Sequence, residues 1–158
     1  MILIVGATGS LGGSTAKILL SQHKPVRVLA RRDSASEELA KAGMATSLES
    51  LRQAGAQVVY GDLKDPVSLE AACQGVGTVI TTANSIKRGG ADHVDSVDLN
   101  GNLNLVAAAR QAGEQHFIFT SMLGAAPDNP SPFFAAKGKV EQALREGGMD
   151  FTIIAPMP

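Results

Sequence analysis

The chain opens on a short apolar segment, Ile2–Val5, that runs directly into the turn Gly6-Ala7-Thr8-Gly9-Ser10-Leu11-Gly12. A strand followed at once by spaced glycines and a helical pattern limits the fold strongly, because each glycine has a defined task. Gly6 permits the tight turn, Gly9 lets a phosphate approach the backbone, and Gly12 lets helix and strand pack without an intervening Cβ. We therefore expect a phosphate group at the N-terminus of this helix, where N–H groups and the helix dipole attract anions.

Short β-rich segments then alternate with longer helical patterns along the chain. The expected strands are Ile2–Val5, Val26–Ala30, Gln57–Tyr60, Thr78–Thr81, His116–Thr120 and Phe151–Ile154. The expected helices are Leu11–Gln22, Ser36–Ala54 with a break at Gly43, Pro66–Cys73, Val94–Ala112 and Phe133–Glu146. This alternation implies right-handed crossovers, and apolar strands without polar alternation indicate burial on both sides. The sequence predicts a Rossmann-type α/β fold, a doubly wound parallel sheet of about six strands with helices on both faces.

The chain has 158 residues, of which 44% are hydrophobic, and a formal net charge of -1. These values fit one domain, residues 1–158, with a two-sided core. No long basic run occurs, so we expect no direct nucleic-acid binding and no membrane attachment. The first apolar run is too short for a signal peptide, so we expect a cytoplasmic protein. His23, His93 and His116 lie in different elements and Cys73 is the single cysteine, so no metal site is predicted.

The end of the second strand indicates which dinucleotide would bind. In an open parallel sheet, ligands bind outside the carboxyl ends of the strands. A carboxylate at the end of the second strand binds the ribose of NAD, whereas arginine accommodates the 2′-phosphate of NADP. Here the strand ends in Arg31 and Arg32, which favours NADP over NAD, while Asp33 argues in the other direction. In the glycine turn, Thr8 and Ser10 offer hydroxyl donors beside Leu11.

Together with Gly61-Asp62-Leu63-Lys64-Asp65, these residues make the chain resemble the atypical short-chain dehydrogenase/reductases, particularly their NmrA-like and isoflavone-reductase-like branch. The resemblance covers nearly all of the chain. It implies that Asp62 and Leu63 contact adenine, with the opening of a turn as the structural alternative for Asp62. It also implies that the strip Thr81-Thr82-Ala83-Asn84 lies under the nicotinamide ribose.

The catalytic pattern departs from that of many short-chain dehydrogenases, in which a tyrosine acid precedes a lysine by four residues. The corresponding segment here runs from Phe133 to Lys137, and a phenyl ring has no proton to give. The serine position falls on Ser121 or Met122, depending on the alignment. The isoflavone-reductase-like branch also lacks the tyrosine, and the resemblance implies that Lys137 clamps the cofactor ribose or relays a proton. A solvated helix lysine is the structural alternative.

Family members continue beyond the segment Phe151–Pro156 into elements that form most of the substrate pocket, so we expect this region to be missing or minimal here. The sequence predicts an NADP(H)-binding oxidoreductase that transfers hydride to a small carbonyl, enone or quinone acceptor. The alternative is a non-catalytic NADP(H)-binding redox sensor or regulator of the NmrA type with a regulatory protein partner, which Phe133 favours. A homodimer is compatible with either. A third, weaker hypothesis is a nucleotide-sugar epimerase or dehydratase, because these enzymes also need the tyrosine that Phe133 replaces here.

Overall fold

The structure is a computed structural model, and it describes residues 1–32, 40–43, 45–86, 89–113 and 116–157. Its strands are β1 (Ile2–Val5), β2 (Val26–Ala30), β3 (Gln57–Tyr60), β4 (Thr78–Thr81), β5 (His116–Thr120) and β6 (Phe151–Ile154). They pair in parallel throughout, in the order β3-β2-β1-β4-β5-β6. The predicted strand bounds and the predicted Rossmann-type sheet are confirmed. The chain winds outward from β1 in one direction and then from β4 in the other, so a ligand crevice is expected between their carboxyl ends.

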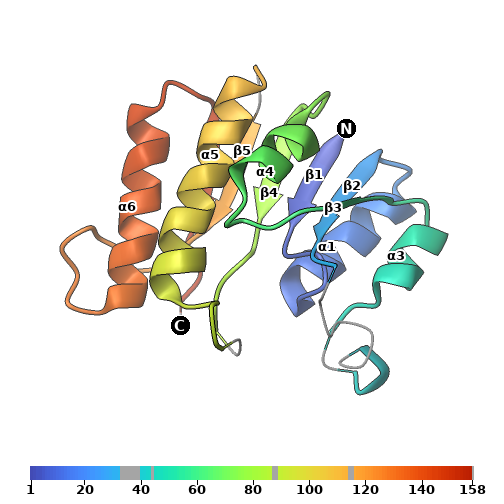
Figure 1. The fold of residues 1–158 in the computed structure, drawn as a ribbon, viewed down its shortest axis with the longest axis horizontal. Coiled ribbons are helices and arrows are strands. Elements are labelled where there is room, and N and C mark those ends of the chain that lie inside the picture. The colour runs from blue at the N-terminus through green and yellow to red at the C-terminus, as the bar shows by residue number, and fades with distance from the viewer. Residues whose placement is uncertain (33–39, 44, 87–88, 114–115, 158) are drawn as a thin grey trace.

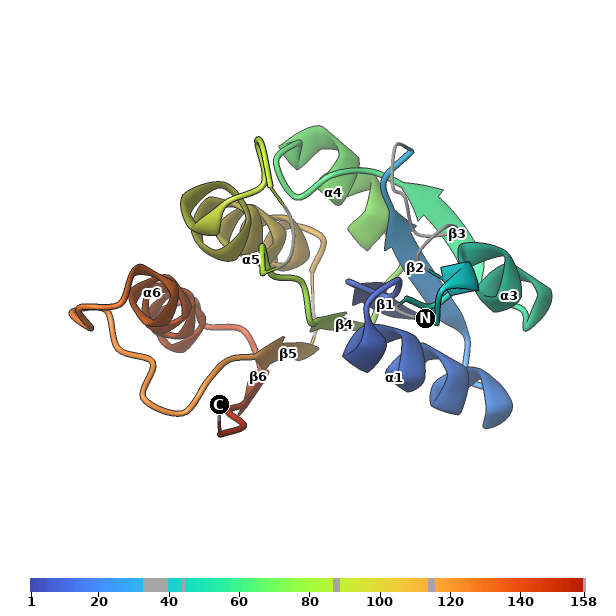
Figure 2. The same ribbon diagram turned by 90° about the horizontal axis from the view of Figure 1, so that it is seen from below.

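Helices cover the sheet on both faces (Figures 1 and 2). They are α1 (Ser10–Ser21), α3 (Leu48–Gln53), α4 (Pro66–Cys73), η1 (Val94–Gly101), α5 (Asn102–Gln111) and α6 (Pro132–Glu146). Figure 2 shows α1 and α3 against one face of the sheet and α4, α5 and α6 against the other. None of the helices in the described ranges is long and apolar enough to cross a membrane.

The strands supply two separate cores, because successive side chains of a strand point to opposite faces of the sheet. Leu3 and Val5 of β1 belong to a large cluster on the α4, α5 and α6 face. Ile4, between them, belongs to a smaller cluster that includes Ala16 of α1 and Leu51 of α3. A strand that contributes to both cores needs apolar residues at every position, which is why β1 has no polar alternation.

The helical pattern Ser36–Ala54 was predicted with a break at Gly43, and its residues 36–39 and 44 lie outside the described ranges. In the described part, Gly43 has a φ of +72° and its N–H donates to the Ala40 carbonyl, so a turn stands where the sequence predicted a break. The helix that follows is only α3. It begins after Ser47, whose hydroxyl caps it by accepting a hydrogen bond from the Ser50 N–H at 3.2 Å.

The predicted helix Val94–Ala112 divides into two kinds of helix. Val94–Gly101 forms the π-helix η1, and the α-helical pattern of α5 begins only at Asn102. Asn102 is fully buried at this junction, and its side-chain amide donates to the carbonyls of Val97 and Asp98 at 3.1 and 3.2 Å. Apolar spacing indicated a helix correctly but did not distinguish the wider π-helical turn from an α-helical one.

Candidate functional site

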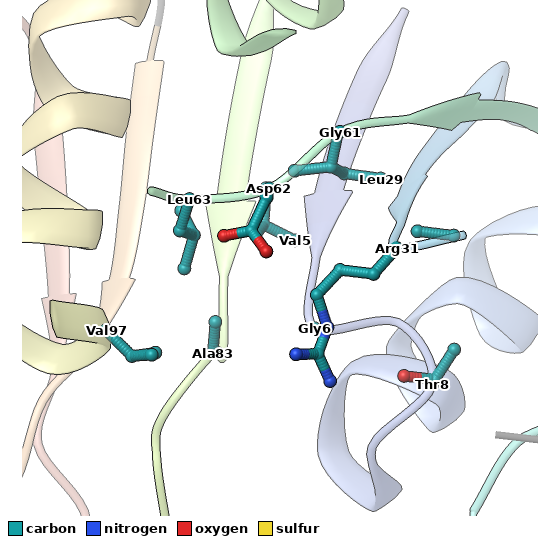
Figure 3. A pocket seen from close by; sticks show the side chains of 11 residues that line it. Val5, Gly6, Thr8, Leu29, Arg31, Gly61, Asp62, Leu63, Ala83 and Val97 are labelled. Carbon is teal, nitrogen blue, oxygen red and sulfur yellow. The ribbon is translucent and has the colours of Figure 1, made fainter. Parts of the chain in front are cut away.

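A pocket lies at the carboxyl ends of β1, β2, β3 and β4, where the winding of the sheet reverses (Figure 3). It is lined by Val5, Gly6, Thr8, Leu29, Ala30, Arg31, Gly61, Asp62, Leu63, Ala83 and Val97. Six of the predicted site residues therefore meet here from four different segments of the chain: Gly6, Thr8, Arg31, Asp62, Leu63 and Ala83. Such a reversal point is where ligands bind in open parallel sheets.

The glycine turn has the tight geometry that the sequence predicted. Gly6 adopts a φ of +92°, and its carbonyl accepts the N–H of Gly9 at 3.0 Å. A Cβ at Gly6 would lie 2.6 Å from Oγ1 of Thr82, and a Cβ at Gly12 would overlap the Gly6 carbonyl oxygen. Gly9 differs, because a Cβ there would meet only the Gly6 oxygen, at 3.3 Å. The fold itself therefore requires glycine at 6 and 12 more strictly than at 9.

A fourth glycine, Gly13, has a structural role that the sequence analysis missed. A Cβ at Gly13 would overlap the side chain of Thr46, and the Thr46 N–H donates to the carbonyl of Thr8 at 2.8 Å. The segment leading to α3 is thus held against the glycine turn. The doubled glycine at positions 12 and 13 was the available signal for this close approach.

The N-terminus of α1 is well suited to an anion. Its N-cap residue is Gly9, which offers no side chain to cap the free N–H groups, and the first turn carries no acidic residue. The unpaired N–H groups and the positive end of the helix dipole therefore have no compensating charge in this turn. Ser10 and Leu11, which begin the helix, are both exposed.

The two arginines predicted to select the cofactor lie in different surroundings. Arg31 lines the pocket, and its guanidinium forms an ion pair of 2.5 Å with Asp92, a residue that the sequence analysis did not single out. Arg32 lies instead over the ring of Tyr60, with 4.8 Å between its guanidinium carbon and the ring centroid. Asp33, the residue that argued for NAD, lies outside the described ranges. The structure thus brings Arg31, but not Arg32, into the lining of this pocket.

Asp62 forms the turn that the sequence offered as its structural alternative, and it also lines the pocket. Its Oδ1 accepts the N–H of Lys64 at 2.8 Å, which forms a turn, and its side chain also faces the pocket (Figure 3). Figure 3 shows Asp62 and Arg31 entering the same space from neighbouring segments. Leu63 is 7% exposed and packs against Gly101, where a Cβ would come within 2.9 Å of the leucine.

Of the strip after β4, Ala83 lines the pocket, whereas the two threonine hydroxyls bond to the protein. Thr81 is buried and donates to Oδ1 of Asn102 at 3.0 Å. Thr82 contacts the carbonyl oxygens of Val5 and Gly6 at 3.5 and 3.4 Å. These hydroxyls fix the strip against β1 and the π-helical junction.

Lys137 is 3% exposed, so its interpretation as a solvated helix lysine is wrong. Its ammonium donates to the Thr120 carbonyl at 3.2 Å and lies 4.9 Å from the Phe119 ring centroid and 5.5 Å from that of Phe133. Burial lowers the pKa of Lys137, and the negative charge of Asp98 opposes that shift. Lys137 does not contribute to the lining of the pocket at β1.

The buried partner of Lys137 is Asp98 on η1, which the sequence analysis did not identify. Oδ1 of Asp98 lies 3.8 Å from the lysine ammonium and accepts no hydrogen bond from the described residues. Its Oδ2 accepts hydrogen bonds from the N–H and hydroxyl of Ser85 at 3.0 and 2.5 Å. The other predicted catalytic residue, Ser121, is buried and donates its hydroxyl to Glu141 at 2.5 Å.

A parallel sheet in this order, with a glycine turn at its reversal point, defines a Rossmann-like α/β protein, a class in which such turns bind dinucleotides. Residues 1–157 match a sequence model of the NmrA-like family. The chain belongs to the NmrA-like family, and the resemblance inferred from its motifs is confirmed. Across the described ranges, no group of three His, Cys, Asp or Glu side chains could hold a metal ion.

The known proteins that this chain resembles extend well beyond the matched region. An NAD(P)H azoreductase of Xenophilus azovorans is 32% identical over 156 residues, which are 99% of this chain and 47% of that protein. Photosystem II assembly factor Ycf39 of Cyanophora paradoxa is 34% identical over 96% of this chain and 43% of its own length. Leucoanthocyanidin reductase of Vitis vinifera, solved in a binary complex with NADPH, is 26% identical with a TM-score of 0.74, covering 98% of this chain and 48% of that one. The chain spans less than half the length of each.

Proposed function

We propose that this chain is the NADP(H)-binding domain of a reductase that transfers hydride to a small carbonyl, enone or quinone acceptor. The observation that carries the proposal is the meeting of Arg31, Asp62 and the glycine turn that leads into the uncapped helix α1 around one pocket at the reversal point of the sheet. Similarity to an NAD(P)H azoreductase and to a reductase solved with NADPH supports the same class of reaction.

In this proposal the pyrophosphate binds at α1, where Gly9 leaves its approach open and N–H groups of the first turn donate to it. The hydroxyls of Thr8 and Ser10 add donors, and Leu11 flanks them. Arg31, with Arg32 beside it, binds the 2′-phosphate, while Asp62 and Leu63 bind the adenine. The strip Thr81–Ala83 lies under the nicotinamide ribose.

The bound cofactor supplies the hydride, and the chain supplies orientation and a proton. Lys137 is the proposed proton donor to the reduced acceptor or clamp on the ribose, and Ser121 orients the substrate. A buried ammonium with a lowered pKa releases its proton more readily than a solvated one, which suits a donor that acts after hydride transfer. The Thr120 carbonyl and Asp98 hold the ammonium in place.

The test is a fluorescence titration with NADPH and NADH, followed by NADPH oxidation with a panel of quinones, enones and azo dyes. We expect NADPH to bind more tightly than NADH and at least one acceptor to be reduced. Equal affinity for both cofactors would contradict the role of Arg31. Tight NADPH binding without oxidation by any acceptor would contradict hydride transfer and favour the sensor.

A further inference from the structure

One buried carboxylate joins the ends of β2 and β3. Asp92, whose side chain is 7% exposed, pairs with the Arg31 guanidinium at 2.5 Å and also with the Lys64 ammonium. Lys64 in turn lies 3.4 Å from Oδ2 of Asp62, and its hydrogen bond to Asp92 raises its pKa against the effect of burial. Asp92 and Lys64 therefore link the pocket-lining residues Arg31 and Asp62, so two cations and two carboxylates lie together. The arginine pair at the end of β2 had suggested a site with positive charge alone.

The backbone fixes Asp92 in this position. Its N–H donates to the carbonyl of Gly89 at 3.1 Å, and the preceding residue, Ala91, accepts a hydrogen bond from the Ser96 hydroxyl at 2.7 Å. Asp92 thus lies two residues before the start of η1, and backbone hydrogen bonds hold it and the residue before it in place. The fold therefore holds its carboxylate beside Arg31, which lines the pocket.

We propose that Asp92 is a specificity-determining residue that weakens NADPH binding relative to NADH by occupying Arg31. The inference rests on the proposed function, in which Arg31 binds the 2′-phosphate. A carboxylate and a phosphate bound to the same guanidinium lie within a few ångströms of each other, and their negative charges repel. This repulsion weakens the binding of NADPH but not that of NADH, which lacks the 2′-phosphate. Asp92 therefore moderates the preference for NADPH that Arg31 alone would give.

The decisive variant is Asp92→Asn, which removes the charge and keeps the size of the side chain. Arg31 and Lys64 are 31% and 33% exposed, so water can solvate them when the carboxylate is gone. We expect the Kd for NADPH to fall about three- to tenfold, and that for NADH to change less than about twofold, as for removal of a partly screened charge. Asp95→Asn is the matched control, because Asp95 is an exposed aspartate in the first turn of η1, three residues from Asp92.

Two further variants test whether the effect depends on Arg31 and whether a second uncharged residue at position 92 reproduces it. In an Arg31→Ala background, Asp92→Asn should no longer change the ratio of the two Kd values, since its effect acts through the guanidinium. Asp92→Ser removes the same charge with a smaller side chain and should shift the ratio of the NADPH and NADH Kd values in the same direction. Thermal unfolding shows whether Asp92→Asn has a folding defect. If it has one, Asp92→Ser provides the test.

The outcomes separate the inference from the proposed function. If the wild-type chain binds both cofactors and neither Asp92 variant tightens NADPH selectively, or if both weaken it, the inference is overturned and the proposed function stands. If the wild-type chain binds neither NADPH nor NADH, the proposed function fails and the inference with it.

Discussion

The ammonium of Lys137 lies 3.8 Å from Oδ1 of Asp98, and the two side chains are 4% and 0% exposed. Their charges come from different elements, α6 and η1, and neither is solvated. A buried charge is tolerated when it is paired and becomes costly when its partner is removed. Replacing Lys137, the proposed catalytic lysine, should therefore lower the stability of the domain as well as its activity. The two effects can be measured separately.

Replacing Lys137 by methionine should destabilise the domain by about 3–5 kcal/mol, because it leaves the Asp98 carboxylate buried without a cation. Adding Asp98→Asn should restore part of that loss, so the double variant should be more stable than Lys137→Met alone. Urea unfolding measures both values. Lys139→Met, an exposed lysine on the same helix, is the control and should change stability by less than about 0.5 kcal/mol.

Asn102→Ala should cost about 2 kcal/mol or more, since the buried amide accepts from the Thr81 hydroxyl and donates to the η1 carbonyls of Val97 and Asp98. Asn100→Ala is the matched control, because Asn100 lies two residues away and is exposed. Thermal unfolding measures the loss of stability in both variants. Equal losses would contradict a stabilising role for the hydrogen bonds of the Asn102 amide.

Gly9→Ala should separate binding from folding. The added methyl group meets only the Gly6 oxygen, so the loss of stability should be at most about 1 kcal/mol, the usual cost of alanine at an N-cap. The same methyl group stands where the pyrophosphate must approach, so NADPH should bind at least about tenfold more weakly. Gly77→Ala, with open space around its Cβ, is the control and should bind NADPH like the wild type. Normal binding by Gly9→Ala would exclude the turn as the phosphate site.

The stability of the domain should depend on pH through Cys73. Burial raises the pKa of this thiol from 9.0 to about 11, so the folded chain keeps a proton that the unfolded chain releases above pH 9. The unfolded state then binds fewer protons, and the free energy of unfolding should fall between pH 9 and 11, by at most about 1.4 kcal/mol per pH unit. Urea unfolding of Cys73→Ala should show a shallower decline across this interval and no difference in slope below it. Parallel slopes throughout would contradict the assignment.

The central strand β1 was predictable to the residue because burial on both sides requires apolar residues at every position, and the apolar run ends where the glycine turn begins. The edge strands β3 and β6 are partly exposed, and they were predicted from short β-rich segments between turns. The helical segments were harder to predict. In Ser36–Ala54 the sequence indicated the break at Gly43, where the chain turns, but not that the next helix begins only at Leu48. In Val94–Ala112, the buried Asp98 and Asn102 mark a π-helix that apolar periodicity does not reveal.

The site was predictable where a motif is local and unpredictable where distant segments meet. The glycine turn and Asp62 are read from neighbouring residues. The pair Arg31 and Asp92 joins positions 61 residues apart, and no pattern in the sequence indicates it. The burial of Lys137 depends likewise on Phe119 and Asp98, which the fold brings from other elements.

The stacking of Arg32 on Tyr60 gives the protein an optical probe of its own. Tyr60 is the single tyrosine and the sequence contains no tryptophan, so all tyrosine emission comes from one ring, which lies against Arg32 at the end of β2. Any ligand that draws Arg32 off that ring changes the surroundings of this one tyrosine. Occupancy at this end of the site can therefore be followed by ultraviolet fluorescence without dyes, labels or engineered residues.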